Sequence, residues 1–271
     1  MAELSVLMSI YLKEKPEYVD ECFKSLLRQT VKANEWVVVE DGPLTEEMYH
    51  VLDQYQIDYP GLLKRVPLEK NQGLGLALKA GVSACSYELI ARMDTDDIAR
   101  DDRFETQILE FKNNPKLDVC GSHIIEFEGN PEHVLSVRKV PLTHEGIVQY
   151  QKTRSAFNHM SVMFKKSSVL KAGNYEHCPL MEDDLLWTRM ILSGAVCSNI
   201  NDYLVYARTG SDMIARRGGW DYFKKYKQGK DIIKGTGFIG TLDYWKAILP
   251  QLAVSLMPVY FRKLLFVKLL R

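Results

Sequence analysis

The sequence predicts an α/β fold: a Rossmann-like, mostly parallel central sheet with helices on both faces, followed by a C-terminal helical appendage. Short apolar runs alternate with amphipathic helical segments over the first hundred residues. The runs at 4–10, 37–39 and 89–93 are mostly apolar rather than alternating, which is typical of strands buried on both faces. Beyond residue 212 the chain becomes rich in lysine. We therefore expect an α/β domain over 1–212 and a basic amphipathic helical region over 213–271.

The first half of the α/β domain is expected to alternate regularly. Its strands are predicted at 4–10, 35–40, 62–66 and 89–93, and its helices at about 16–27, 45–55 and 71–85. Pro16 suits a first helical turn, where its missing N–H is not needed, and Thr45 is a suitable N-cap. Because strands joined through helices run parallel, their carboxyl ends should share one edge of the sheet, where ligands bind in open α/β sheets.

The second half of the domain alternates less regularly, which predicts a mixed continuation of the sheet. Helices are expected at 101–114, 167–172 and 181–192. Strands are expected at 117–127, 134–140, 160–165 and 203–208. Pro115 ends the first of these helices, because a residue before proline is disfavoured in helical conformation.

An acidic cluster, Asp94-Thr95-Asp96-Asp97, directly follows the strand expected at 89–93. Like charges placed side by side repel one another unless a cation lies among them. A set of oxygen ligands favours Mg²⁺ or Mn²⁺ over zinc, and such ions commonly bridge proteins to substrate phosphates. The structural alternative is a solvated acidic loop that caps the next helix.

A second acidic turn, Glu182-Asp183-Asp184, begins the helix expected at 181–192. Asp183 and Trp187 lie one helical turn apart, so they share a face of this helix. Three acids at a helix N-terminus are also favoured by the helix dipole alone, which is the structural alternative here.

Other patterns limit the possible classes. The formal net charge is +0, so the chain has no overall positive charge that would attract nucleic acid. The segment from Asn71 to Gly75 contains G-x-G but lacks the third glycine of a dinucleotide fingerprint, so we reject that motif. The five cysteines are scattered and odd in number, which favours a reduced, cytoplasmic compartment. We expect no signal peptide and no membrane-spanning helix, because no apolar window reaches about 18–20 residues.

The C-terminal region combines charge and amphipathicity. From residue 213 onward, twelve lysine and arginine residues face three aspartates, a difference of nine positive charges. Apolar residues recur through 242–271, and Pro250 and Pro258 are expected to interrupt the helix there. Such a segment suits a membrane interface with anionic lipid. A helix pair packed on the body is the alternative.

Several segments together resemble the family-2 glycosyltransferases of the GT-A fold. They are Ser5–Tyr11, Val37–Gly42, Asn71 with Gly73, Arg92–Ile98 followed by Asp102, Arg103, Phe104 and Gln107, His159–Phe164, Gly173–Tyr175, and Glu182-Asp183 followed by Leu186, Trp187 and Arg189. The resemblance covers about residues 4–210 in one order. Leu12 stands where many members carry asparagine, and Arg216–Trp220 only loosely resembles the arginine motif of processive members. Processive chain synthesis and a membrane span are therefore not expected.

The resemblance implies roles for individual residues. Those expected around the nucleotide are Ser9, Tyr11, Asp41, Asn71, Gly73 and Asp94. Asp96, with Asp94, is expected to hold Mn²⁺ or Mg²⁺, and Asp183, with Glu182 as second choice, to act as the catalytic base. Residues that can assist at phosphate or acceptor are His159, Trp187, Arg208, Arg216 and Arg217. For Trp187 a core position, and for His159 a purely structural role, are the alternatives.

The expected activity is inverting, metal-dependent transfer of a sugar from a nucleotide-diphosphate donor, a UDP-sugar, to a glycan or lipid-linked acceptor hydroxyl in cell-surface polysaccharide assembly. The expected location is cytoplasmic and peripheral on the inner face of the membrane. The rival activities are a nucleotidyltransferase and an inactive sugar-binding subunit. The first needs a glycine-rich phosphate loop, and Tyr11–Pro16 contains no glycine. The second does not need the intact acidic motifs at 94–96 and 182–183.

Overall fold

The computed structural model describes residues 3–209, 218–258 and 262. Within these residues nine strands form one sheet, in the order β3-β2-β1-β4-β8-β6-β9-β5, with β7 paired to β6. The strands are β1 (Leu4–Ile10), β2 (Glu35–Glu40), β3 (Leu63–Pro67), β4 (Leu89–Arg92), β5 (Ile98–Ala99), β6 (Leu117–Phe127), β7 (Val134–Arg138), β8 (Met163–Lys165) and β9 (Val196–Arg208).

The helices of the α/β body lie between these strands. They are α1 (Pro16–Leu27), α2 (Glu46–Asp58), α3 (Leu74–Ala84), α4 (Arg103–Asn113), α5 (His144–Gln151), the 3₁₀ turn η1 (His159–Ser161), α6 (Lys166–Lys171) and α7 (Glu182–Leu192). Two longer helices follow, α9 (Trp220–Gly235) and α10 (Thr241–Leu256). The predicted bounds of the first three strands and helices are met within a few residues, and the Thr45 hydroxyl caps α2 by accepting from the Met48 N–H at 3.2 Å.

The sheet changes from parallel to mixed strand pairing where the sequence becomes less regular. Strands β1, β2, β3 and β4 pair in parallel, as predicted. Strand β8 then pairs antiparallel with both β4 and β6, and β6 runs parallel to β9. The expected fold class, with its mixed second half, is therefore confirmed.

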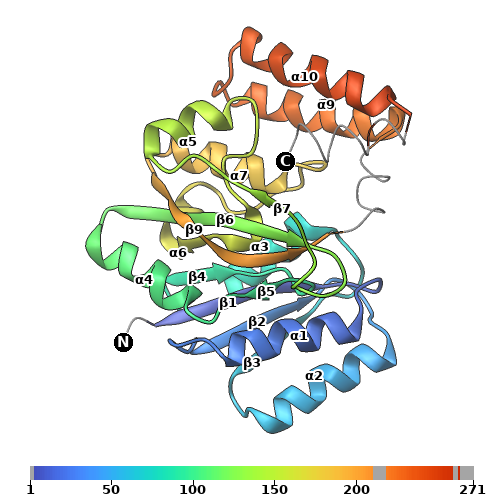
Figure 1. Cartoon of the computed structure of the whole chain (residues 1–271), viewed down its shortest axis with the longest axis vertical. Helices are drawn as coiled ribbons and strands as arrows, with labels where there is room; N and C mark the ends of the chain where they lie inside the picture. The colour runs from blue at the N-terminus through green and yellow to red at the C-terminus, as the bar shows by residue number, and fades with distance from the viewer. Residues whose placement is uncertain (1–2, 210–217, 259–261, 263–271) are drawn as a thin grey trace.

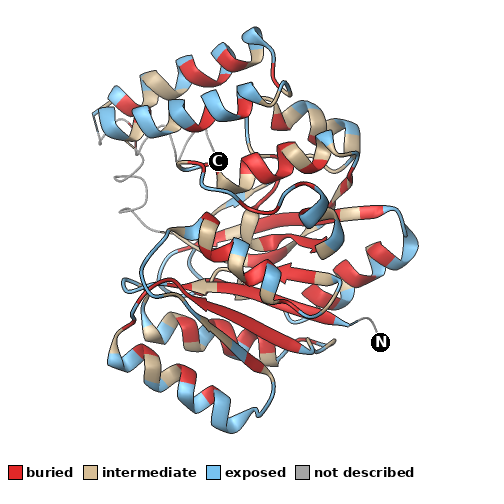
Figure 2. Ribbon diagram, turned by 180° about the vertical axis from the view of Figure 1, so that it is seen from behind, coloured by how far each residue is buried: buried red, intermediate tan, exposed pale blue. Residues whose placement is uncertain are grey.

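Two hydrophobic clusters cover the two faces of the sheet. In β1 the even positions Val6 and Met8 belong to the cluster that α1, α2 and α4 complete, whereas Leu7 belongs to the cluster completed by α3, α5, α6 and α7. This alternation follows from the period-2 geometry of a strand, whose side chains point to opposite faces. Figure 2 shows the central strands of the sheet largely buried between these layers; β1, β2 and β6 are buried along almost their whole length, whereas β7 is mostly exposed.

Several elements differ from the prediction, among them the two-residue strand β5, which was not predicted, and β8, which begins at Met163 rather than at residue 160. Helix α5 was not predicted, although Thr143 caps it by accepting from the Gly146 N–H at 3.2 Å. Strand β9 begins at Val196 rather than near residue 203, because Asn201 and Asp202 lie in an irregularity of the β6–β9 register and not in a turn. Helix α10 continues through Pro250, which the prediction had interrupting it, and ends before Pro258.

The C-terminal helices pack on the body. Figure 1 shows α9 and α10 side by side at the end of the molecule opposite α2. A third cluster joins them to α7 and the preceding loop: Cys178, Met181, Leu185, Phe223, Ile233, Ile239, Tyr244 and Ile248. The packed helix pair, which the sequence left as an alternative, is therefore present. No helix among the described residues has the length and apolarity needed to cross a membrane.

All five cysteines are free thiols and all are buried. Cys22 lies beneath the acidic loop, with its Sγ 3.5 Å from the backbone oxygen of Asp94. Burial raises the pKa of this thiol well above its usual value, and the nearby aspartates raise it further.

Candidate active site

The acidic loop lies between β4 and β5, at the carboxyl end of a central parallel strand. The carboxylate oxygens of Asp94, Asp96 and Asp97 lie within 4.8 Å of one another. The loop turns tightly, because the Asp97 N–H donates to the Asp94 oxygen at 3.3 Å. The structure thus brings the predicted metal-binding residues together and adds Asp97 to them.

Buried arginines support this loop from below. Arg92 is 1% exposed and its guanidinium forms an ion pair with Asp94. Arg103 is fully buried and donates to the Arg92 oxygen at 2.7 Å and to the Gln107 Oε1 at 3.0 Å. Burial lowers the pKa of Arg103 to about 9. Arg92 and Arg103 therefore place two positive charges under a negative loop.

The carboxylates of the loop repel one another. Burial and then the charge of Asp94 raise the pKa of Asp96 to about 6, and burial followed by Asp96 and Asp94 raises that of Asp97 well above its usual value. The buried Oδ2 of Asp97 has no hydrogen-bond partner in the described part of the chain. Clustered carboxylates with an unpartnered oxygen fit a divalent cation with oxygen ligands.

Arg208, at the end of β9, holds the acidic loop in place through hydrogen bonds. Its N–H donates to Asp97 Oδ1 at 2.7 Å and its Nε donates to the Asp96 oxygen at 3.0 Å. The guanidinium also bonds Glu21 and the Gly129 oxygen and lies 4.0 Å from the centre of the Tyr18 ring. These contacts are all within the protein, and Arg208 also lines a cavity beside the loop, so its role at phosphate stays a prediction. The other two candidates, Arg216 and Arg217, lie outside the described residues.

A first cavity of about 1040 Å³ opens on one side of the acidic loop. Every residue predicted around the nucleotide lines it: Ser9, Tyr11, Asp41, Asn71, Gly73 and Asp94. The remaining lining comes from Asp96, Thr95, Leu74, the segment before α1 (Lys13, Glu14 and Lys15) and Tyr18 in the first turn of α1. The sequence prediction therefore grouped these residues correctly in space.

Asp41 shapes the far wall of the first cavity. Its Oδ1 accepts from the Gln72 N–H at 2.7 Å and its Oδ2 from the Gly73 N–H at 3.0 Å, so the carboxylate holds the loop before α3. Gly42 has φ of +87°, and a Cβ there would lie 2.6 Å from the Asn71 nitrogen. The close approach of these two loops therefore requires glycine.

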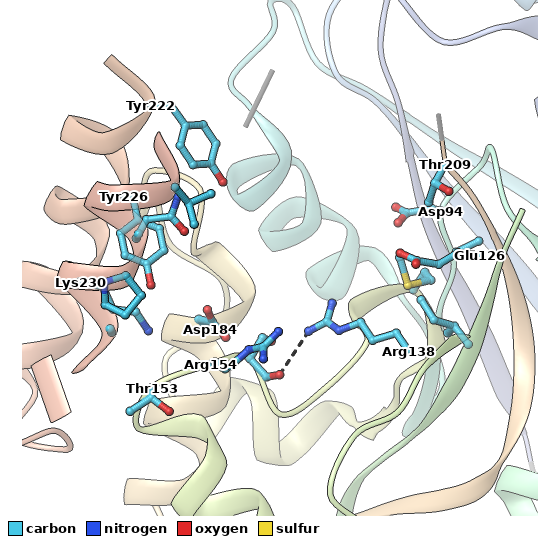
Figure 3. A pocket seen from close by; sticks show the side chains of 18 of the residues that line it. Asp94, Glu126, Arg138, Thr153, Arg154, Asp184, Thr209, Tyr222, Tyr226 and Lys230 are labelled. Atoms are coloured by element: carbon cyan, nitrogen blue, oxygen red, sulfur yellow. Dashed lines mark hydrogen bonds between the residues drawn. The ribbon is translucent and has the colours of Figure 1, made fainter. Parts of the chain in front are cut away.

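A second cavity of about 750 Å³ lies on the other side of the loop and reaches the C-terminal helices. Asp94, Asp96, Asp97 and Arg208 form one end of it. Figure 3 shows Tyr222, Tyr226 and Lys230 extending from α9 at the other end, with Asp184 and Arg154 between. Asp94 and Asp96 line both cavities and so stand at their junction.

The second acidic turn lies against the same region. A Cβ on Gly75, in α3, would lie 2.9 Å from the Glu182 Cβ, which fixes α7 close to the loop that borders the first cavity. Burial raises the pKa of Glu182, and the charge of Arg92 opposes part of this rise. Burial, Asp184 and Glu182 raise the pKa of Asp183 well above its usual value. Of these three acids, Asp184 lines the second cavity, while Glu182 and Asp183 line neither cavity.

Two predicted acceptor residues belong to the interior instead. Trp187 is 1% exposed and packs against Phe157 and Phe164, so it cannot stack on an acceptor in this conformation. His159 is hydrogen-bonded through Nε2 to the Tyr175 hydroxyl at 2.9 Å. Burial lowers the pKa of His159 well below its usual value, and the charge of Arg92 lowers it further. The structural alternatives for both residues are therefore the ones observed.

Sequence reasoning missed several residues of the two cavities. In the first cavity one missed residue is Glu14. Burial, followed by the charges of Asp96 and Asp94, raises the pKa of Glu14 to about 7. Arg138, Arg154, Lys230 and Lys246 line the second cavity from β7, from the turn after α5, from α9 and from α10. No local motif marks these four residues, because only the packing of α9 and α10 on the body brings them together.

Comparison with known proteins gives a consistent result. The model of the family described as "Glycosyl transferase family 2" matches residues 5–170. The amylovoran biosynthesis glycosyltransferase AmsE of Erwinia amylovora is 41% identical over 268 residues, covering 97% of this chain and 98% of the relative. An Escherichia coli UDP-Gal:alpha-D-GlcNAc-diphosphoundecaprenol beta-1,3-galactosyltransferase is 35% identical over 270 residues, covering 99% and 97%.

Solved structures agree on the fold. Residues 1–349 of S. aureus TarS in complex with UDP-GlcNAc superpose with a TM-score of 0.66 at 18% identity, covering 98% of this chain and 76% of that one. The mannosyltransferase PcManGT of Pyrobaculum calidifontis, in complex with GDP-Man and Mn²⁺, gives a TM-score of 0.64 at 13% identity, covering 96% and 71%.

Proposed function

The chain belongs to glycosyl transferase family 2 and is a glycosyltransferase with a GT-A fold; from this premise we propose that it transfers a sugar from a UDP-sugar to a hydroxyl of a lipid-linked acceptor, with inversion, during cell-surface polysaccharide assembly. One observation carries the proposal. Asp94 and Asp96 line both cavities, so a donor in one cavity and an acceptor in the other would meet at the same carboxylates.

The first cavity is assigned to the donor. It holds the six residues predicted around the nucleotide, and its volume of about 1040 Å³ exceeds what a small-molecule site requires. Lys13 and Lys15 add positive charge near the donor phosphates, and Tyr11 offers a ring to the base. The UDP-GlcNAc complex of a structure with the same fold supports a nucleotide sugar as the donor.

Asp94 and Asp96 would hold a divalent cation, with Asp97 beside them. When bound, Mn²⁺ or Mg²⁺ supplies positive charge that stabilises the oxygens of the departing diphosphate. Arg208 keeps the loop in place through its bonds to Asp97 and the Asp96 backbone. Arg92 and Arg103 offset part of the negative charge of the loop while no cation is bound.

Asp183 is assigned as the general base. It takes the proton of the acceptor hydroxyl while the acceptor oxygen bonds to the anomeric carbon and the bond from that carbon to the diphosphate oxygen breaks. A single displacement of this kind inverts the anomeric centre. Burial raises the pKa of Asp183, which increases its affinity for the proton that it removes. Since Asp183 does not line the second cavity as it stands, the first turn of α7 must present it when an acceptor is bound.

The acceptor class is supported by the relatives. The name of the Escherichia coli relative specifies a GlcNAc-diphosphoundecaprenol acceptor, and that of the Erwinia amylovora relative specifies amylovoran biosynthesis. A lipid-linked acceptor calls for contact with a membrane, and α10 offers a suitable surface. The outward stripe on this helix consists of Leu242, Trp245, Leu249 and Leu256, which are 77%, 47%, 56% and 58% exposed. We assign this stripe to the inner face of an anionic membrane, to which the basic C-terminal region is electrostatically matched.

The test of the transferase assignment is UDP release. The full-length protein is incubated with Mn²⁺, a panel of UDP-sugars and an acceptor that carries GlcNAc on a lipid diphosphate. We expect acceptor-dependent UDP release with at least one donor. In the Asp96→Ala variant, calorimetric titration with UDP should no longer depend on Mn²⁺. UDP binding that responds equally to Mn²⁺ in this variant would remove Asp96 from the cation site.

A further inference from the structure

Lys230 of α9 is a buried cation that lines the second cavity. It is 1% exposed, and in the described part of the chain it makes no hydrogen bond or ion pair. Burying an ammonium group without a partner costs several kcal/mol, so such groups are normally paired. The contrast with Lys227 on the same helix is clear, since Lys227 is exposed and bonds Asp231 at 2.7 Å. Lys230 is therefore placed to meet an anion that enters the cavity.

Other basic side chains surround the same end of the cavity. Arg154 follows α5, Arg138 ends β7 and Lys246 lies on α10, and all three line it with Lys230. Figure 3 shows Arg154 and Arg138 facing the α9 side chains across the cavity. Arg138 donates to the Ser155 oxygen at 3.2 Å, which fixes the direction of its guanidinium. Two acids line the cavity near these side chains, and both already accept hydrogen bonds: Asp184 from Gln151 at 2.8 Å, and Glu126 from the Ser136 hydroxyl.

These basic residues of the second cavity are separate from the first cavity, which is assigned to the donor. The first cavity has its own lysines, Lys13 and Lys15, and shares only Asp94 and Asp96 with the second. An anion bound at Lys230 therefore lies beyond the cation site as seen from the donor. Tyr222 and Tyr226 lie alongside and bring hydroxyl groups to the same end. Lysine and arginine together with hydroxyl donors are the groups that bind phosphate.

We propose that Lys230, Arg154, Arg138 and Lys246 bind the phosphate groups that join the acceptor sugar to its lipid. This assignment rests on the proposed glycosyltransferase function and specifies its acceptor. With the phosphates at the α9 end, the acceptor sugar extends toward Asp94 and Asp96, where the donor sugar is delivered. The enzyme then selects a sugar carried on a phosphate ester over the same sugar in a neutral glycoside.

The experiment compares two acceptors that differ in charge. One carries GlcNAc on an alkyl diphosphate, and the other is the neutral alkyl glycoside of the same sugar and chain length. The ratio of kcat/KM for the two acceptors is measured for the parent and for Lys230→Met, Arg154→Gln and the control Lys227→Met. We expect the ratio to fall roughly 10- to 150-fold in Lys230→Met, as for the loss of a hydrogen bond between charged groups, and to stay at the parent value in Lys227→Met.

The possible results distinguish a failure of the phosphate site from a failure of the proposed transferase function. Because Arg154 is exposed, Arg154→Gln keeps the test valid if Lys230→Met does not fold. An unchanged ratio in both variants overturns the phosphate site while leaving the transferase proposal intact. Loss of UDP affinity in Lys230→Met, measured by titration, would assign this lysine to the donor diphosphate and also overturn the proposal. Absence of acceptor-dependent UDP release from the parent with either acceptor would instead count against the proposed function.

Discussion

The backbone N–H of Arg208 donates to the Asp97 carboxylate at 2.7 Å, across 111 positions of sequence. The bond joins the end of β9 to the acidic loop after β4, and the Arg208 side chain adds a second bond to the Asp96 oxygen. The geometry of the acidic loop therefore depends on β9, the last strand in the sequence among the described residues.

Replacing Arg208 with lysine should weaken this connection. Lysine cannot supply the Nε donor to Asp96 or the planar guanidinium over Tyr18, so the acidic loop loses its side-chain support. We expect UDP affinity in the presence of Mn²⁺ to fall about tenfold in calorimetric titration. Glu21→Gln is the control, because it removes only the ion pair to Glu21, a carboxylate that is 49% exposed, and pairs that reach solvent are worth about 0–1 kcal/mol. Equal losses in the two variants would contradict a role for the bonds to the loop.

The assignment of Asp183 as the general base is tested by comparing it with its neighbour Asp184. Asp183→Asn should reduce kcat by about 10²–10⁴-fold, the usual contribution of a general base, with UDP affinity retained. Asp184→Asn should have the smaller effect, since its carboxylate is already held by Gln151. Single-turnover kinetics with saturating donor measures the transfer step directly. A larger loss in Asp184→Asn would move the base assignment to the acid that lines the second cavity.

Glu14 should make stability depend on pH. Its pKa is raised to about 7 by burial and then by Asp96 and Asp94, from an ordinary value of 4.5. The folded chain thus keeps this proton up to about pH 7, whereas the unfolded chain releases it near 4.5, so the contribution of Glu14 to stability falls as pH rises between these values. We expect Glu14→Gln to raise the Tm of the metal-free protein at pH 8 and to have little effect at pH 4.5. A Tm difference that does not vary with pH would refute this interpretation.

Trp187 should matter for stability rather than for acceptor binding. It is 1% exposed and packs within the cluster beneath α7, so Trp187→Ala should lower the free energy of unfolding by about 3–5 kcal/mol in urea titration. Trp187→Phe retains an aromatic ring in the core, and its KM for the acceptor should remain within about twofold of the parent. A large rise in this KM without loss of stability would favour the stacking role expected from the sequence.

The apolar stripe of α10 should determine binding to lipid. Replacing Leu242, Trp245 and Leu249 together with serine removes three exposed side chains, each worth roughly 1.5–3 kcal/mol when buried. We expect flotation with anionic vesicles to fall more than about 100-fold, while the helix pair stays folded because the stripe faces away from the third cluster. Ile57→Ser is the control, since Ile57 is also exposed, at 71%, and lies on α2 at the other end of the molecule. Vesicle binding that survives the triple substitution would argue against this surface.

The parts of the fold that could be predicted are those in which local pattern and tertiary environment agree. The β1 and β2 strands match their predicted bounds because strands buried on both faces favour unbroken apolar residues. The two-residue strand β5 carries no such pattern and exists because Ile98 pairs with Tyr206 of β9. The lining of the first cavity could be predicted because its residues follow strand ends in a family-like order. Lys230 could not, because a lysine in a lysine-rich helix normally faces solvent and only the docking of α9 buries it.

The burial of every cysteine has a practical consequence for studying this molecule. Alkylating reagents attack thiolates, and these five thiols are shielded from solvent and poorly ionised, because burial raises the pKa of each. In the native protein, alkylation should therefore proceed only through transient local opening. Since Cys22 lies under Asp94, its labelling rate would report how often the floor of the acidic loop opens, without any engineered probe.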